Sequence, residues 1–129
     1  MFRIIALVSI LAATVTLTAC TSRPIRNVDN DPVVTAGKPA TMADVEHAIT
    51  RAGAGLGWVM TPVRPGEMTG RLALRTHVAV VDITYDTRTF SIRYKDSVNL
   101  DYANGNVHKN YNGWIENLER EIRANLLRM

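Results

Sequence analysis

The sequence has a single cysteine, no marked excess of charge of one sign and no hydrophobic run of membrane-spanning length. One cysteine among 129 residues excludes an intramolecular disulfide, so packing must hold the fold together. Lysine and arginine number 15 against 12 aspartates and glutamates, and the net charge of +3 is scattered along the chain. This distribution favours solubility and argues against a nucleic-acid partner. The apolar run from Ile4 to Leu17 is shorter than the about 20 residues that a membrane-spanning helix needs.

Motifs for catalysis and metal binding are also missing. His77 and His108 lie far apart in the sequence, and no short-spaced pair of metal ligands occurs. Ser97, His108 and an aspartate are the residue types that support nucleophilic catalysis. However, no nucleophile-elbow motif surrounds the serine, and nothing in the sequence brings the three residues together. We therefore expect no metal and no other cofactor.

The first residues have the pattern of a secretory signal peptide. A basic start at Met1–Arg3 precedes the apolar run, and small residues follow. The sequence Leu17–Cys20, LTAC, resembles the lipobox of bacterial lipoproteins. The resemblance implies that residues 1–19 are removed and that Cys20 becomes the acylated N-terminus. More than one acyl chain on Cys20 would bind the membrane firmly, so the membrane is an expected partner. The next residue is Thr21, not the aspartate associated with inner-membrane retention. The expected location is therefore the cell envelope, at the outer membrane and facing the periplasm.

Residues 20–40 are expected to form the lipidated N-terminus and a flexible tether. From Thr21 to Ala40 the chain is polar and contains three prolines and a glycine, which disfavour regular structure. A flexible coil of this length would span roughly 25 Å. The alternative is that Val33–Thr35 adds a short edge strand to a sheet.

Residues 41–129 are expected to form a single α+β domain. Thr41 and Asp44 suit a capped helix start, and the apolar spacing predicts a helix over Met42–Ala52. Turn signals occur at Arg64–Glu67 and Asp86–Arg88. Strand patterns occupy the stretches Trp58–Val63, Met68–Leu74, Thr76–Tyr85 and Phe90–Lys95. We expect them to form a three- to four-stranded antiparallel sheet.

A C-terminal helix is predicted to follow the turn at Asn104–Gly105 and to pack on the sheet. Apolar residues recur with a helical period from Val107 to Leu126, the clearest periodicity in the chain. Glu119 and Arg123 are spaced as an acid-before-base pair on its exposed side.

Two segments, Ser91–Tyr102 (SIRYKDSVNLDY) and Val107–Leu118 (VHKNYNGWIENL), resemble a signature of small uncharacterised bacterial lipoproteins. Together with the lipobox, the resemblance implies a class and a location, and it implies no activity.

Polar and aromatic residues gather in the same region and make it the candidate binding surface. Its members are Asp96, Ser97, Asn99, His108, Tyr111 and Asn112. Near the start of a helix, such groups could recognise an anionic or glycan-like group, although they could equally shape a strand exit or belong to the core. We expect a non-catalytic binding, accessory or structural module that contacts an envelope protein or glycan. The alternative is a small envelope hydrolase or ligand-binding protein that uses the Asp96–His108 region.

Overall fold

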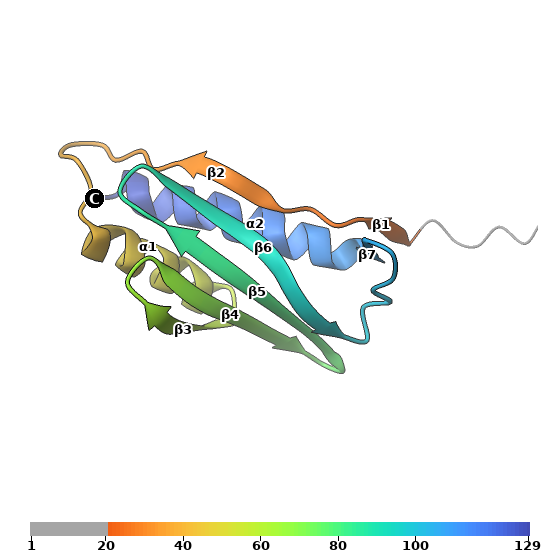
Figure 1. The fold of residues 1–129 in the computed structure, drawn as a ribbon. Coiled ribbons are helices and arrows are strands. Elements are labelled where there is room, and N and C mark those ends of the chain that lie inside the picture. The colour runs from red at the N-terminus through yellow and green to blue at the C-terminus, as the bar shows by residue number, and fades with distance from the viewer. Residues whose placement is uncertain (1–20) are drawn as a thin grey trace, which may run out of the picture.

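The computed structural model describes residues 21–129 (Figure 1). The expected signal peptide, residues 1–19, and the lipidation site Cys20 lie outside the described residues. The helices are α1 (Met42–Gly55) and α2 (Lys109–Leu127). The strands are β1 (Ser22–Pro24), β2 (Val28–Pro32), β3 (Trp58–Arg64), β4 (Glu67–Leu74), β5 (His77–Tyr85), β6 (Thr89–Val98) and β7 (Asn106–His108). In this part of the chain no helix is long and apolar enough to cross a membrane.

The main sheet has five antiparallel strands in the order β2-β6-β5-β4-β3, and both helices cover one of its faces (Figure 1). Alternate residues of β5 point into the core, from Ala79 to Tyr85, and their neighbours are more exposed. The fold is therefore α+β, as predicted. The sheet has more strands than the expected three to four, and β1 and β7 form a separate two-stranded sheet at one end.

The capping residues start α1 where the sequence predicts it. The Asp44 N–H donates to Thr41 Oγ1 at 3.1 Å, and the Thr41 N–H donates to Asp44 Oδ2 at 2.9 Å. The backbone N–H of Thr41, followed by its hydroxyl, lowers the pKa of the Asp44 carboxyl below its usual value. The helix continues past the predicted Ala52 and ends at Gly55.

The predicted turns join the long strands as hairpins. Gly66 has φ +85° between β3 and β4, the left-handed conformation that a type II turn requires at this position. Between β5 and β6, Asp86 Oδ1 accepts hydrogen bonds from the N–H groups of Arg88 (2.7 Å) and Thr89 (2.8 Å). These local bonds fix the antiparallel pairing of the two strands.

The apolar stripe of α2 is buried as the period predicts, with Tyr111, Ile115, Leu118, Ile122 and Leu126 all inaccessible to solvent. One residue on the polar side of the helix differs from the prediction. Glu119, predicted to be exposed, is buried and lies 2.9 Å from Arg123 Nη2 and 3.1 Å from Arg26 Nη2. The prediction failed because the segment that covers Glu119 comes from residues expected to be a tether.

The expected flexible tether is wrong for residues 22–32. β1 pairs with β7, and β2 forms an edge of the main sheet beside β6. Val33–Thr35, the alternative edge strand, lies outside the strand, which ends at Pro32. An edge strand tolerates proline and charged residues because one side of its backbone needs no partner. Val28 is buried and Asn30 has φ 52° at an irregularity in the pairing, so long-range packing decides a structure that local propensity argued against.

Candidate functional site

The expected binding surface lies at the end of the molecule where β6 ends and α2 begins (Figure 1). Its first three residues shape the exit from β6. The Ser97 N–H donates to Asp96 Oδ1 at 2.8 Å, and Ser97 Oγ lies 2.8 Å from the Tyr94 hydroxyl oxygen. Asn99 has φ 62°, and its carbonyl oxygen lies 2.7 Å from His77 Nδ1. These groups stabilise the local backbone and neighbouring side chains.

His108 is the N-cap residue of α2. Its Nδ1 accepts a hydrogen bond from the Asn110 N–H at 3.2 Å, and its own backbone N–H donates to the Leu100 carbonyl at 2.8 Å. Within residues 21–129 no hydrogen bond joins His108 to Ser97. The arrangement therefore lends no support to the alternative of an envelope hydrolase in the Asp96–His108 region.

Tyr111 belongs to the core, and its prediction as a surface residue is wrong. The side chain is fully buried, and its ring meets Tyr94 edge-on with centroids 5.6 Å apart. Among the described residues its hydroxyl has no hydrogen-bond partner. Burial, and then the neighbouring Tyr94, raise the pKa of Tyr111 well above its usual value. The helical period that makes Tyr111 a core residue was present in the sequence, so the burial itself was predictable.

Removal of this buried hydroxyl is expected to stabilise the protein. Tyr111→Phe should raise the free energy of unfolding by about 1 kcal/mol, because a buried polar group without a partner costs about 1–3 kcal/mol. Urea denaturation of the two proteins measures the difference. Tyr94→Phe is the matched control and should lower stability, because its hydroxyl contacts Ser97. A less stable Tyr111→Phe protein would contradict the assignment.

Asn112 fastens the N-terminal segment to α2. Its Oδ1 accepts a hydrogen bond from the Arg26 N–H, and its Nδ2 donates to the Pro24 carbonyl, both at 2.9 Å. The two bonds satisfy one backbone group at the end of β1 and one in the link to β2. Asn112 was predicted to be available for a partner, but its amide is occupied within the fold.

Asn112→Ala is expected to destabilise the protein by about 1–2 kcal/mol, since two hydrogen bonds to backbone groups are lost. Amide exchange should accelerate at Arg26, whose N–H loses its acceptor. Asn117→Ala is the control, because its side chain bonds only to Arg120 of the same helix in the described structure. Equal stability of the two variants would show that the contacts of Asn112 contribute little.

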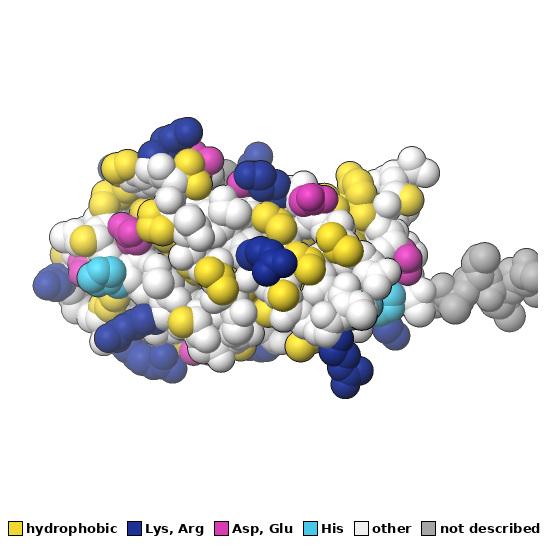
Figure 2. Space-filling view, turned by 90° about the horizontal axis from the view of Figure 1, so that it is seen from below, with side chains coloured by type: hydrophobic (Ala, Val, Ile, Leu, Met, Phe, Trp, Pro, Cys, Tyr) yellow, Lys and Arg dark blue, Asp and Glu magenta, His cyan; other side chains and the backbone are white. Residues whose placement is uncertain are grey.

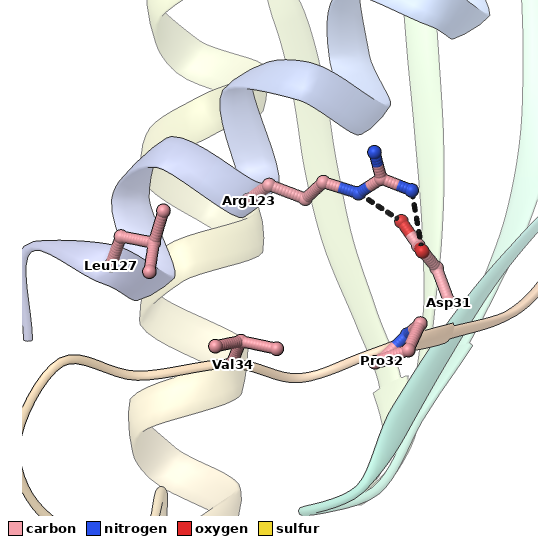
Figure 3. Close-up of a pocket in the computed structure, with 5 residues that line it drawn as sticks. All are labelled: Asp31, Pro32, Val34, Arg123 and Leu127. Carbon is pink, nitrogen blue, oxygen red and sulfur yellow. Dashed lines mark hydrogen bonds and ion pairs between the residues drawn. The ribbon is translucent and has the colours of Figure 1, made fainter.

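A second candidate site, the distal groove, lies at the other end of the molecule. It is a hollow of about 360 Å³ lined by Asp31, Pro32, Val34, Arg123 and Leu127. Figure 3 shows Arg123 and Leu127 reaching it from α2, and Asp31, Pro32 and Val34 from β2 and the chain that follows. The side chains of Val34 and Leu127 are exposed. The groove therefore exposes apolar surface to solvent.

A bidentate ion pair forms the polar wall of the distal groove. Arg123 Nε donates to Asp31 Oδ2 at 2.7 Å, and Arg123 Nη2 donates to Asp31 Oδ1 at 2.6 Å. Asp31 is only 8% exposed, and the bonds to its carboxylate raise the pKa of Arg123. The pair is therefore a fixed part of the site, while the aliphatic side chains beside it face solvent.

A second hollow, of about 500 Å³, continues from the distal groove along α2 and shares Arg123 and Leu127 with it. Its lining is mostly charged: Arg26, Glu116, Glu119, Arg120, Arg123, Ala124 and Leu127. Arg26 contacts both Glu119 at 3.1 Å and Glu116 at 4.0 Å. The two hollows give one surface that is apolar at the end of α2 and charged along its side.

The distal groove was not predicted from the sequence, because three of its five lining residues were expected to belong to a tether. The sequence does place the acidic Asp31 next to the apolar Val33 and Val34, and it places Arg123 on the C-terminal helix. Pairing of Asp31 with Arg123 is the one feature that could have indicated the groove. Across the described part of the chain, no group of three or more histidine, cysteine, aspartate or glutamate side chains is placed to hold a metal ion.

Comparisons with protein-family models, with curated proteins and with solved structures gave no match to this chain.

Proposed function

We propose that this protein is a lipid-anchored component of the bacterial envelope that acts as a non-catalytic binding or accessory module. Acylated Cys20 attaches it to the outer membrane on the periplasmic side. The distal groove binds the partner, a protein of the envelope. The lipobox-like sequence supports the anchor, and the geometry of the two ends supports the binding site.

The carrying observation is that β1 begins beside the start of α2 (Figure 1), whereas the distal groove is lined by Leu127 at the end of that helix. The Lys109 N–H at the start of α2 donates to the Thr21 carbonyl at 2.7 Å, and Leu127 at the end of α2 lines the groove. At 1.5 Å per residue these two points are about 27 Å apart. An anchor on Cys20 therefore leaves the groove directed away from the membrane.

The lining of the distal groove suits a protein segment. Val34 and Leu127 can bury an apolar side chain, and each such contact is worth about 25 cal/mol per Å² of apolar surface removed from water. The ion pair between Asp31 and Arg123 is already formed, so it can orient polar groups of the partner without first becoming ordered. A glycan ligand is the other outcome that the binding experiment can reveal.

The anchor is tested on the full chain expressed in a bacterium with an outer membrane. Mass spectrometry of the purified protein should find an N-terminal peptide that begins at Cys20 and carries acyl chains. Cys20→Ser should move the protein from the membrane fraction to the soluble periplasmic fraction. An intact leader, or an unacylated N-terminus on the wild-type protein, would contradict the anchor.

The groove is tested by cross-linking in cells followed by co-purification from mild detergent. Leu127→Asp should remove one specific envelope protein from the cross-linked set, because a charge placed in an apolar contact opposes burial. Val63→Asp is the matched control, an exposed valine on β3 away from the groove. The binding role of the groove is wrong if both variants retain the same cross-linked proteins.

A further inference from the structure

We infer that the end of the domain opposite the distal groove rests directly on phospholipid headgroups. This anchor end consists of the β4–β5 hairpin tip (Leu74–His77), the segment Val98–Ala103 and Lys109 at the start of α2. The inference depends on the proposed acylation of Cys20. It adds that the domain is seated on the membrane in one orientation and does not hang from a tether.

The first reason is the lack of slack between the anchor and the domain. Ser22 pairs with His108 in the small sheet, and the Thr21 carbonyl is bonded to Lys109. Only Thr21 separates Cys20 from Ser22, and two extended residues span at most about 7 Å. The polar headgroup layer on each side of a bilayer is about 5–8 Å thick. A lipid on Cys20 therefore holds the β1–β7 end of the domain at the headgroups.

The second reason is that the parts of the anchor end are joined to one another. His77 Nδ1 lies 2.7 Å from the Asn99 carbonyl oxygen, which ties the hairpin tip to the end of β6. The His108 N–H donates to the Leu100 carbonyl at 2.8 Å, which ties that segment to the start of α2. In Figure 1 all of these parts lie at the end where β1 begins. A membrane at Cys20 would consequently meet them together.

The third reason is the exposure of apolar and aromatic side chains on the anchor end. Leu74 is 48% exposed, Val98 is 56% exposed and Tyr102 is 51% exposed. The Tyr102 ring stacks on Tyr94 with centroids 4.5 Å apart, so its position is fixed. Tyrosine favours the membrane–water interface because an apolar ring and a polar tip suit the two sides of that boundary.

The charges of the anchor end are mixed. Arg75 at the hairpin tip and Lys109 have no ion pair in the described structure, and Asp96 and Asp101 carry opposite charges nearby. Figure 2 shows hydrophobic, basic, acidic and histidine side chains next to one another at its right-hand end. Because positive and negative charges are balanced, the lipid anchor and the contacts of apolar and aromatic side chains with the interface determine how the domain is oriented on the membrane. Zwitterionic and anionic membranes should both support it.

The test uses the acylated full-length mature protein in phosphatidylcholine vesicles that contain a headgroup-attached nitroxide quencher. A fluorophore is placed at Tyr102→Cys or Leu74→Cys on the anchor end, and at Val34→Cys in the distal groove as control. Quenching at each of the first two positions should exceed that at the control at least about twofold, because the ends are about 27 Å apart along α2. Two labelled positions are used because either substitution alone could disturb the fold.

Equal quenching at all three positions of an acylated, vesicle-bound protein would overturn the seating and leave the anchor intact. Absence of acyl chains in the mass spectrum would overturn both. Replacement of one third of the lipid by phosphatidylglycerol should leave the quenching ratio unchanged. A ratio that exceeds one only with the anionic lipid would contradict the interfacial seating and indicate purely electrostatic contact.

Discussion

A chain that begins at Val33 is expected to lose cooperative folding, whereas a chain that begins at Thr21 should fold. The deletion removes β2, which forms one edge of the main sheet and buries Val28 against the core. It also removes Arg26, which in the described part of the chain is one of two cations that contact the buried Glu119. If residues 21–32 were a flexible tether, their removal would change nothing.

The expected cost of this deletion is on the order of 5 kcal/mol or more, within the range of about 5–15 kcal/mol that a whole domain has available. It combines the loss of buried apolar surface with the loss of partners for buried charges. Far-ultraviolet circular dichroism during urea titration measures it, with the chain from Thr21 as the reference. Similar unfolding midpoints for the two chains would contradict the integration of β2 into the fold.

Arg123→Ala is expected to destabilise the protein by about 2–4 kcal/mol. Among the described residues, the Asp31 carboxylate has hydrogen bonds only from Arg123, and Asp31 is almost completely buried. Removal of the arginine leaves that charge buried and unpaired, which is the costly way to break such a pair. The exposed half of Arg123 reduces the figure, because solvent screens part of the interaction. Thermal unfolding should show a fall in Tm of roughly 4–8 °C for each kcal/mol.

Two control variants isolate the cause of this effect. Arg120→Ala removes a cation from the same helix. Among the described residues its side chain bonds only to Asn117, so the variant should change stability by less than about 0.5 kcal/mol. The double variant Arg123→Ala with Asp31→Ala should be more stable than Arg123→Ala alone, because it removes the buried unpaired charge. A double variant that is less stable than both single variants would show that the loss comes from packing.

The prediction on stability and the proposed binding role of the distal groove need different variants as tests. Arg123→Ala alters both the stability and the lining of the distal groove, so it is unsuitable as a test of binding. Leu127→Asp changes an exposed side chain at the end of α2 and leaves the ion pair in place. Loss of the proposed partner in that variant would therefore result from altered recognition at the groove.

The sequence by itself determined the elements whose signals are local. The apolar period of α2, the capping pair at the start of α1 and the turn residues Pro65–Gly66 and Asp86 act within a few positions of the chain. Each fixes a helix or a hairpin through its own backbone geometry and hydrogen bonds. They were sufficient to predict an α+β fold with two helices and an antiparallel sheet.

Only the tertiary structure decided the fate of residues 21–32 and of the candidate site. Prolines, asparagines and aspartates argue for a loop locally, but β6 and α2 supply the partners that make β2 an edge strand. Asn112 and Glu119 look like surface residues in the helical pattern, but residues 21–32 contact them in the folded protein. These contacts join residues some 60 to 90 positions apart. Such pairings depend on how elements pack in space, which no local propensity records.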